Sequence, residues 1–433
     1  MNLSERIESS LTPESLALIR LVKTEAERLN LPLYIVGGSV RDLLLGSVIK
    51  DFDLIVEGDA ARLADALLRK FGGKVLFHAR FGTATWTLDE TTSKRLNIPI
   101  FQLAEFPPFI DLISARSETY PEPGALPAIK RSTIDDDLRR RDFTVNAMAV
   151  RLDGKYYGDL YDPLGGQKDL ENKLIRILHP QSFIDDPTRM FRAVRYAVRY
   201  QFELESVTQQ AAVDAEARAV LSRLSGERIR HEFDLIFEEE KPLVILVALE
   251  DLSLIKVIHP ALEKVRAMAL SHLKKPADEF GKFALPGILS LRQALGWILY
   301  LLHLPQADID TVARRLAFPA LLTDSIRAAS SLLADLPSFK DWKPSQWTFH
   351  LDELPSLSVY AVWLVTSESP LHDYLTKWQH VKPITTGDDL VARGLEPGPK
   401  FKDILARLRA ARLDGEVGSD IEEEQLLRRL VRQ

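Results

Sequence analysis

Two aspartates placed two residues apart are the first feature of this chain whose type and spacing suit chemistry. Asp51 and Asp53 lie in DFDLIV (51–56), whose period-two alternation predicts a short strand. Side chains two apart on a strand leave the same face, and carboxylates roughly 6–7 Å apart along it can share hard divalent cations. Solvated acids at a strand end give the same pattern, so the pair alone does not identify a metal site.

A glycine turn, GGSVRD (37–42), lies upstream between the apolar run LYIV and a short helix-forming run. Gly38 lets a phosphate approach the backbone, and a helix N-terminus there favours an anion. Arg41 would add a charge-assisted donor to it. An ordinary turn is the alternative for this motif by itself. In this order, however, the turn and the carboxylates describe a triphosphate held beside a metal site, as phosphoryl or nucleotidyl transfer requires.

Further motifs extend this pair in a fixed order, and together they resemble the signature of class II tRNA nucleotidyltransferases and bacterial poly(A) polymerases. The motifs are GGSVRD (37–42), DFD (51–53), RRDFTVNA (140–147), DDPTR (185–189), SGERI (225–229) and, more thinly, GLEPGP (394–399) with LDGE (413–416). Asp185 departs from the family pattern, which has Glu there, so the supporting role of that residue is open. The resemblance implies Mg²⁺ as the cofactor, held by Asp51 and Asp53.

The resemblance also implies which residues contact the nucleotide. RRDFTVNA is similar to the family's ribose motif, in which Asp142 accepts from a sugar hydroxyl and Arg141 donates to the nucleotide. We expect one arginine of 139–141 to be only a surface charge. Asn146 either binds the nucleotide or hydrogen-bonds to unpaired backbone groups at the end of a strand or helix, and the sequence favours neither role.

The motif DDPTR has a physical interpretation beside its resemblance to the family's base-reading motif. Asp186 and Arg189 are three apart and would share a face of a helix. Cytosine and adenine each present an amino donor beside a ring-nitrogen acceptor, which match a carboxylate and a guanidinium. Uracil and guanine reverse that order, and each buried mismatch costs about 1–3 kcal/mol. Two side chains can thus select C and A without a nucleic-acid template.

The same predicted helix continues with arginines at spacings of three, three and four. A solvated arginine face is the usual explanation of such a run. Because the base-reading pair precedes it, a triphosphate partner is the better interpretation. The resemblance assigns nucleotide contacts to Arg192 and Arg195 and leaves Arg199 unassigned. Asp111, in IDLISAR, is a candidate third catalytic carboxylate from a neighbouring strand; a strand-end acid with a local partner is the equal alternative.

The elements that must position these residues form two kinds of region. The first 170 residues mix predicted strands, such as KVLFHARF, TATWTL and IDLISA, with a helix over 59–71 that ends at Gly72-Gly73. Beyond about residue 187, apolar residues recur three and four apart, which predicts helices. We therefore predict an α+β fold, with a polymerase-beta-like nucleotidyltransferase head on a small mixed sheet and an all-α remainder. The predicted parts are the head (1–170), a neck that reads the base and binds RNA (171–245), a body (246–385) and a tRNA-binding tail (386–433).

Composition bounds the remaining possibilities. The chain has 433 residues, a net charge of −6 and no cysteine, so disulfide-linked partners, thiol nucleophiles and cysteine zinc sites are excluded. The start MNLSERIESS has no apolar h-region, and the most apolar stretch (294–302) is far shorter than the roughly 20 residues that span a bilayer. We therefore expect a cytoplasmic protein without a membrane partner.

The function predicted from these observations is template-independent addition of CCA to the tRNA 3′ end from CTP and ATP. The family alternatives are an A-only or CC-only enzyme or a poly(A) polymerase. A non-catalytic RNA-binding protein on the same fold is the alternative from another class; the intact carboxylates argue against it. His372-Asp373 resembles part of an HD phosphohydrolase site, but no ordered ligand set accompanies it.

The segment DLISARSETY (111–120) is similar to the start of a family loop that is implicated in the change from C to A addition and that CC-only members lack or shorten. The residues after it, PEPGALPAIKRST (121–133), have the Pro, Gly and small residues of a mobile connection. A passive linker is the alternative. Retention of this loop favours full CCA addition over CC-only addition and leaves A-only addition open. The role of the irregular segment 90–108 is not predicted.

Overall fold

The computed structural model describes residues 1–432 except 48, 50–52, 79–81, 98–104, 266, 274–279, 281–282 and 286–288. The chain separates into two compact units, Met1–Leu224 and Ser225–Gln433. Each unit is described by itself below. The finer division into head, neck, body and tail stays a prediction.

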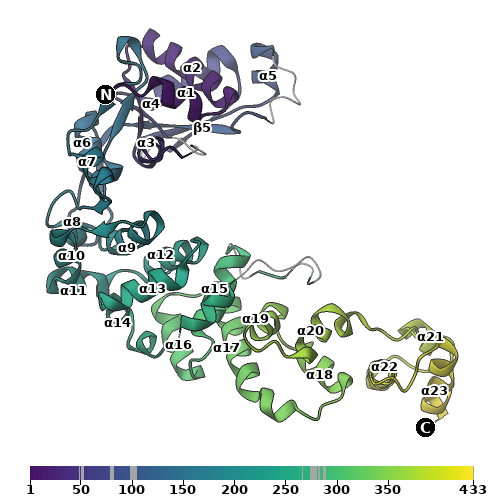
Figure 1. Ribbon diagram of the computed structural model, residues 1–433. Helices are drawn as coiled ribbons and strands as arrows, with labels where there is room; N and C mark the ends of the chain where they lie inside the picture. The colour runs from purple at the N-terminus through teal and green to yellow at the C-terminus, as the bar shows by residue number, and fades with distance from the viewer. Residues whose placement is uncertain are drawn as a thin grey trace. The chain divides into compact units, whose positions relative to one another are not determined.

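The first unit is built on a seven-stranded mixed sheet (Figure 1). Its strand order is β3-β4-β5-β2-β1-β8-β9, with β2 and β5 parallel and the other neighbouring pairs antiparallel. The predicted mixed sheet, and with the helices around it the predicted α+β class, are confirmed. The strands are β1 (Leu33–Val36), β2 (Leu54–Val56), β3 (Lys74–His78), β4 (Thr83–Thr87), β5 (Phe109–Ser114), β8 (Ala149–Arg151) and β9 (Leu160–Tyr161).

Helices α1 (Ser4–Ser10), α2 (Pro13–Arg28) and α4 (Ala60–Phe71) cover one face of this sheet and form the larger core with it (Figure 1). Helix α4 begins where the Asp59 carboxylate accepts from the backbone N–H of Ala61 at 3.0 Å. It ends at Gly72, whose φ of +77° is a conformation that glycine adopts without a steric penalty. Both limits agree with the prediction for 59–71.

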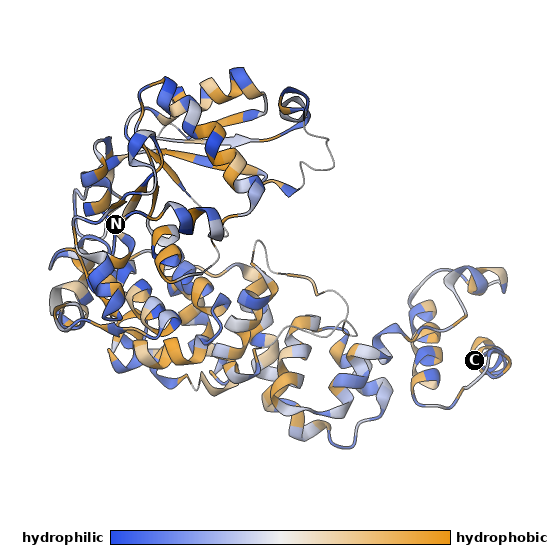
Figure 2. Ribbon diagram, turned by 45° about the horizontal axis from the view of Figure 1, so that its top comes forward, coloured by the Kyte–Doolittle hydropathy of each residue, from blue (hydrophilic) through white to orange (hydrophobic). Residues whose placement is uncertain are grey.

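The opposite face of the sheet carries a smaller core formed with α6 (Ile134–Arg139). Figure 2 shows the strands of this unit as largely hydrophobic, as expected for a sheet covered on both faces. The remaining short elements around the sheet are α3 (Gly38–Leu44), α5 (Glu90–Leu96), α7 (Gly166–Glu171) and the 3₁₀ turns η3 (Thr144–Asn146) and η4 (Gly154–Tyr156).

A helical segment completes the first unit. It contains α8 (Ser182–Asp185), α9 (Thr188–Tyr200), α10 (Ser206–Val213) and α11 (Ala215–Arg223), with the short parallel pair β10 (Leu174–Ile175) and β11 (Glu203–Leu204). The base-reading motif stands at the junction of α8 and α9.

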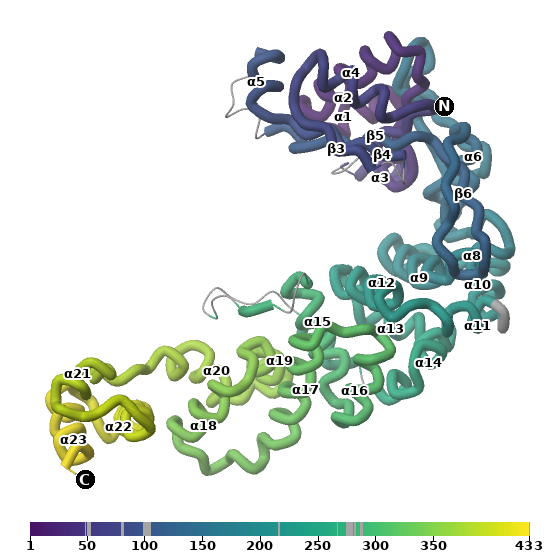
Figure 3. Tube along the Cα trace, turned by 180° about the vertical axis from the view of Figure 1, so that it is seen from behind, coloured from purple at the N-terminus to yellow at the C-terminus, as the bar shows by residue number. Residues whose placement is uncertain are grey.

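The segment after Tyr120 differs from the prediction of a mobile connection. Strand β6 (Arg116–Thr119) pairs antiparallel with β7 (Ala128–Arg131), so the sequence 121–133 is in part a hairpin strand. The hairpin runs from the sheet toward α8 (Figure 3), where the backbone N–H of Gly124 donates to the carbonyl oxygens of Ile184 and Asp185 at 3.1 and 3.2 Å. The turn residues thus mark the hairpin's tip, and backbone pairing satisfies the polar groups on either side.

The second unit is helical, and no strand occurs among its described residues. No helix of the described chain is both long enough and apolar enough to cross a bilayer. The helices are α12 (Gly226–Glu238), α13 (Pro242–Asp251), α14 (Leu254–Ile258), α15 (Leu291–Leu301), α16 (Gln306–Arg315), α17 (Ala320–Asp335), α18 (Pro344–Leu351), α19 (Ser356–Thr366), α20 (Ser369–Thr376), α21 (Gly387–Ala392), α22 (Pro399–Leu413) and α23 (Asp420–Arg432), with 3₁₀ turns η5 (Pro260–Lys264), η6 (Ala267–His272), η8 (Leu336–Phe339) and η9 (Trp378–His380).

Aromatic side chains of α12 and α15 form the centre of this unit. Phe233 and Phe237 each lie 5.1 Å, between ring centroids, from Trp297, and Tyr300 is 5.8 Å from Phe233. All four rings are buried, so Trp297 and Tyr300 belong to the core and not to a stacking surface. The C-terminal helices α21, α22 and α23 share a separate small core.

Candidate functional site

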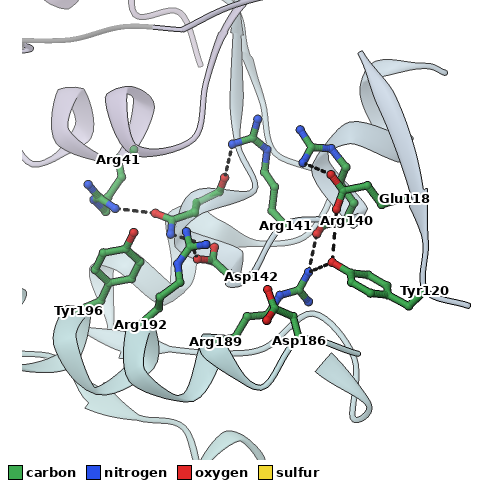
Figure 4. Close-up of a pocket in the computed structure, with 12 residues that line it drawn as sticks. Arg41, Glu118, Tyr120, Arg140, Arg141, Asp142, Asp186, Arg189, Arg192 and Tyr196 are labelled. Atoms are coloured by element: carbon green, nitrogen blue, oxygen red, sulfur yellow. Dashed lines mark hydrogen bonds and ion pairs between the residues drawn. The ribbon is translucent and has the colours of Figure 1, made fainter. Parts of the chain in front are cut away.

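A polar cavity of about 350 Å³ in the first unit brings together residues from three of the predicted motifs (Figure 4). Seven predicted nucleotide contacts line it, from the glycine turn, the ribose motif and the α8–α9 junction. Arg195 is not among the lining residues. The lining consists of Gly38, Arg41, Glu118, Tyr120, Arg140, Arg141, Asp142, Asn146, Asp186, Arg189, Arg192 and Tyr196.

The glycine turn is shaped by the approach of another side chain. Strand β1 ends at Val36, and Gly37 then adopts φ +68° before α3 begins. A Cβ atom on Gly37 would lie 2.4 Å from Nη1 of Arg141. Glycine is favoured here by its positive φ, and a larger residue would also displace the end of the Arg141 side chain. The turn and the ribose motif are one packed arrangement.

Arg41, which the sequence predicts as a donor to a phosphate at the turn, is engaged by groups of the protein itself. Its side chain is buried; Nη1 donates to Oδ1 of Asn146 at 2.6 Å, and Nε donates to Oδ1 of Asp42 at 2.9 Å. The guanidinium carbon also lies 4.4 Å from the centroid of the Tyr200 ring. These contacts fix the guanidinium at the cavity wall, where it is still one of the lining groups.

Asp142 is held as a buried carboxylate. It accepts from the backbone N–H of Phe143 at 2.8 Å and from Nδ2 of Asn146 at 3.0 Å, and it pairs with Nη2 of Arg192 at 2.6 Å. Burial raises the pKa of Asp142, but Arg192 and the hydrogen bond from Asn146 outweigh it, so the pKa lies below the ordinary value. Asn146 bridges Asp142 and Arg41 by hydrogen bonds, so it satisfies polar groups of the protein and also lines the cavity.

The base-reading pair does not share one helix face. Helix α8 ends at Asp185 and α9 begins at Thr188, while Asp186 is extended (φ −138°, ψ 94°). The residue before a proline is disfavoured in the helical region, and Pro187 enforces this break. The Asp186 carboxylate instead accepts from the N–H and hydroxyl of Thr188, the first residue of α9, at 3.1 and 2.7 Å. Both members of the pair still line the same cavity.

Arg189 is fixed by three neighbours. Nη1 donates to Oγ of Ser182 at 2.8 Å, and Nη2 donates to the carbonyl of Arg140 at 2.9 Å and contacts the Tyr120 hydroxyl at 3.3 Å. The side chain is 5% exposed, so few other orientations are open to it. A guanidinium held in this way is pre-organised for a ligand of fixed geometry.

The arginines farther along α9 differ in exposure. Arg192 lines the cavity, Arg195 is buried, and Arg199 is exposed. In the ribose motif, the expected surface charge is Arg139, which is exposed, whereas Arg140 and Arg141 both line the cavity.

Sequence reasoning missed Asp137, which organises both of these arginines. Its carboxylate is fully buried and accepts from Arg140 at 2.8 Å and Arg141 at 2.9 Å. Burial raises the pKa of Asp137, but Arg141 and Arg140 outweigh that effect and hold it below the ordinary value. The signal was present in DDDLRRRD, because Asp137 precedes the two arginines by three and four positions on a helical turn.

The hairpin adds two further residues that the sequence did not single out as ligands. Glu118 pairs with Arg140 at 2.9 Å, and the Tyr120 hydroxyl lies 3.3 Å from a Glu118 carboxylate oxygen. Burial raises the pKa of Tyr120 to about 12 against the opposing effect of Arg189, with Glu118 and Asp186 adding to the rise, so its hydroxyl stays protonated near neutral pH. Both side chains come from β6 and the residue after it, which only the folded hairpin brings to the cavity.

Of the candidate catalytic carboxylates, Asp53 and Asp111 are described by the structure, and neither is among the residues that line the cavity. Asp51 lies outside the described residues. Asp53 immediately precedes β2 and is exposed, and the parallel register Leu54↔Leu112 puts it beside Asp111 of β5, with both on the same face. Asp111 accepts from Oγ1 of Thr85 at 2.5 Å. Oxygen donors on neighbouring strands fit a hard divalent cation. Within the described part of the chain, no three acidic or histidine side chains gather as a metal-binding group.

His372 shows no sign of an HD metal site in the described structure. Its ring lies 5.8 Å from Phe280 and 5.6 Å from Trp363 between centroids, within an aromatic cluster of the second unit. The His372 ring therefore has a packing role in this aromatic cluster.

Two protein-family models match the chain. The Poly A polymerase head domain matches residues 33–176, and the model described as the probable RNA and SrmB-binding site of polymerase A matches residues 201–265. The first match contains the glycine turn, the carboxylates and the ribose motif. The α8–α9 junction lies between the two matches.

Similar proteins cover almost the whole chain. An A-adding tRNA nucleotidyltransferase of Halalkalibacterium halodurans is 33% identical over 96% of this chain and 92% of its own. A CC-adding tRNA nucleotidyltransferase of Deinococcus radiodurans is 30% identical over 92% and 88%. The solved structure of the Thermotoga maritima CCA-adding enzyme complexed with tRNA_CCA has a TM-score of 0.73 at 28% identity, over 100% of this chain and 98% of that one.

Proposed function

Because this chain belongs to the family of class II tRNA nucleotidyltransferases and bacterial poly(A) polymerases, we propose that it completes the 3′ end of tRNA by adding C, C and A from CTP and ATP. The tRNA 3′-hydroxyl oxygen forms a bond to the α-phosphorus of the nucleotide, and the bond from that phosphorus to the bridging oxygen of pyrophosphate breaks. The products are a tRNA longer by one nucleotide, pyrophosphate and the proton of the hydroxyl.

The observation that carries this proposal is the presence of Asp186 and Arg189 in one cavity. A carboxylate and a guanidinium complement the edge that cytosine and adenine share, as argued from their hydrogen-bonding groups. The contacts of Arg189 with Ser182 and the Arg140 carbonyl hold it in place before a nucleotide arrives. The same pair thus suits both CTP and ATP, and it opposes UTP and GTP.

The charges of the cavity suit the rest of a nucleoside triphosphate. Five arginines line it against three carboxylates, which leaves an excess of two positive charges. The Asp142 carboxylate is ionised and is the candidate acceptor for a ribose hydroxyl. Arg41, Arg141 and Arg192 are the candidate phosphate contacts, since a guanidinium binds phosphate oxygens by paired hydrogen bonds.

The carboxylates of the sheet fit Mg²⁺, as the family implies. Asp53 would hold it, with Asp51 as the second predicted ligand, and Asp111 is the candidate acceptor for the proton of the attacking hydroxyl. When bound, Mg²⁺ stabilises the charge that develops on the phosphate oxygens and lowers the pKa of a coordinated hydroxyl.

Addition of A alone is the second candidate. It is favoured by the higher identity to A-adding relatives, of which one is 33% identical, than to a CCA-adding relative at 27%. Full CCA addition is supported by the retained hairpin with Glu118 and Tyr120 and by solved CCA-adding enzymes of this fold, at 27% and 26% identity, that contain ATP or CTP. Both candidates share the A step. The expected cytoplasmic location stays a prediction.

The decisive experiment supplies the protein with three tRNA transcripts, which end before C74, before C75 and before A76. Each transcript is incubated with CTP, ATP, both or neither, and the products are resolved at single-nucleotide length. Full CCA activity extends all three to the same end. Extension of only the transcript that ends in CC would replace the proposal by A-only addition. Binding of all three without extension would favour the non-catalytic RNA-binding alternative.

A further inference from the structure

Tyr196 stands at the centre of an unusual group of cations. The guanidinium carbons of four arginines lie within 6.0 Å of the centroid of its ring. The distances are 5.5 Å for Arg41, 5.7 Å for Arg195, 5.6 Å for Arg199 and 6.0 Å for Arg192. Three of these arginines share α9 with the tyrosine, and Arg41 comes from α3 at the glycine turn.

This arrangement poses an electrostatic problem that an aromatic ring can reduce. Four like charges around one point repel one another, and the pairs of Asp42 with Arg41 and of Asp142 with Arg192 offset part of this repulsion. The π face of a tyrosine carries negative charge density and attracts guanidinium groups. The ring lines the cavity together with Arg41 and Arg192.

We propose that Tyr196 is a positioning residue that gathers Arg41 and the arginines of α9 into one polyphosphate-binding group. This inference rests on the proposed function in one respect, because it takes the polyphosphate to be that of a nucleoside triphosphate. The ring itself touches no phosphate. It acts by holding the guanidiniums close together in the absence of the anion, which lowers the cost of assembling them when the anion binds.

A purely structural role makes a different prediction. The Tyr196 ring meets Phe143 edge to face, at 5.9 Å between centroids and 82° between planes, so part of its contribution is packing. Packing depends on the shape of the ring, whereas attraction of cations depends on its electron density. Replacements that keep the shape and change the electron density therefore separate the two roles.

The experiment measures binding of inorganic tripolyphosphate to the full chain by titration calorimetry. The variants are Tyr196→Phe, Tyr196→pentafluorophenylalanine and Tyr196→Leu. Tyr156→Leu is the matched control, because Tyr156 also lies beside cations, Arg151 at 4.6 Å and Lys155 at 5.2 Å, but away from the cavity. Thermal unfolding of each variant reports on packing independently.

We expect Tyr196→Phe and the Tyr156→Leu control to bind tripolyphosphate within about twofold of the parent chain, because both keep an electron-rich ring at position 196. Tyr196→pentafluorophenylalanine and Tyr196→Leu should bind it about tenfold more weakly. In the tRNA assay, the KM values for CTP and ATP should rise by a similar factor, with kcat, the KM for tRNA and the preference for ATP over GTP little changed.

Equal binding by the Phe and pentafluorophenylalanine variants would overturn the proposal, because packing alone would then explain the residue. This comparison does not depend on whether Tyr196→Leu folds. A rise in KM confined to tRNA would also overturn it. If the parent chain binds tripolyphosphate with the expected variant pattern but extends no tRNA, the proposed function fails while the role of Tyr196 stands. If the parent chain extends tRNA normally but the Tyr196 variants all bind tripolyphosphate as the parent does, the role of Tyr196 fails while the proposed function stands.

Discussion

The walls of the cavity in the first unit and the aromatic centre of the second unit both contain buried side chains, but these side chains are of opposite kinds. Around the cavity, the fully buried Asp137 and the nearly buried Arg189 are held by hydrogen bonds and ion pairs. In the second unit, Phe233, Phe237 and Trp297 pack ring against ring. Apolar burial stabilises a fold directly, whereas buried ion pairs roughly offset their own desolvation. The apolar region should therefore contribute more to stability than the charged one, which suits the ligand-binding role proposed for the cavity.

The largest effect that this contrast predicts is the loss of nucleotide addition without loss of folding. Asp53→Ala and Asp51→Ala should each lower incorporation more than about 100-fold, because each removes a candidate metal ligand at the reacting phosphate. tRNA binding should persist, because neither variant removes surface that grips RNA. A primer-extension assay together with a filter-binding assay measures both quantities. Near-normal turnover in both variants would contradict the metal assignment.

The next prediction compares a buried charge with a buried ring. Asp137→Ala leaves two guanidiniums without their shared carboxylate, and Trp297→Ala leaves a large cavity; each should cost about 3–5 kcal/mol of unfolding free energy. Hydrogen exchange followed by peptide mass spectrometry should locate the first loss in residues 1–224 and the second in 225–433. Only Asp137→Ala should also weaken nucleotide binding. Equal weakening by Trp297→Ala would remove the functional distinction between the two regions.

The third prediction tests whether the charged cavity discriminates between the bases of the four nucleoside triphosphates. Asp186→Ala should reduce the preference for CTP and ATP over UTP and GTP by about tenfold or more, because the carboxylate that opposes a carbonyl is gone. Arg189→Ala should instead weaken the use of both correct nucleotides. The measurement is kcat/KM for CTP and UTP on a tRNA that ends before C74, and for ATP and GTP on a tRNA ending in CC. A uniform loss of rate in Asp186→Ala, with its selectivity intact, would refute the side-chain template.

The smallest effect concerns pH. In the first unit, burial raises the pKa of Asp142, but Arg192 and Asn146 lower it more; the net pKa is lowered. Such a group stabilises the fold above its unfolded-state pKa, near 4, and that contribution is lost as the pH falls through the folded-state value. In the second unit, burial raises the pKa of Asp234 despite the hydrogen bond from Trp297. That carboxyl therefore costs stability above its folded-state pKa and ceases to do so as the pH falls below it.

Acidification from pH 7 toward pH 3 should therefore increase hydrogen exchange around Asp142 before it does so around Asp234. Asp142→Asn should reduce the acid sensitivity of the first region, with Asp137 responsible for part of the remainder, whereas Asp234→Asn should change the second region little at low pH. Exchange rates of peptides from α9 and α12, measured at several pH values, check this order. The opposite order would show that these two carboxyls do not control acid stability.

Much of the fold could be predicted because the signals are local. Asp59 and Gly72 mark the ends of α4 through a side-chain cap and a left-handed turn, both of which depend on nearby residues alone. Alternation in β5 and the apolar burial of Trp297 are likewise readable from spacing. The hairpin β6–β7 was missed because its partner strands are joined by Pro- and Gly-rich residues that equally suit a linker.

The candidate site likewise has features that the sequence predicts and others that only the folded chain shows. The types and order of Gly38, Asp186 and Arg189 predicted a nucleotide-binding chemistry, because hydrogen-bonding capacity belongs to the residue type, and the family resemblance added Asp142. Only the tertiary structure decided which distant partners a side chain meets: Arg41 against Asn146 and Tyr200, Arg189 against Tyr120, and Asp142 against Arg192. Those contacts depend on distances between segments far apart in the chain, which residue types and spacing do not specify.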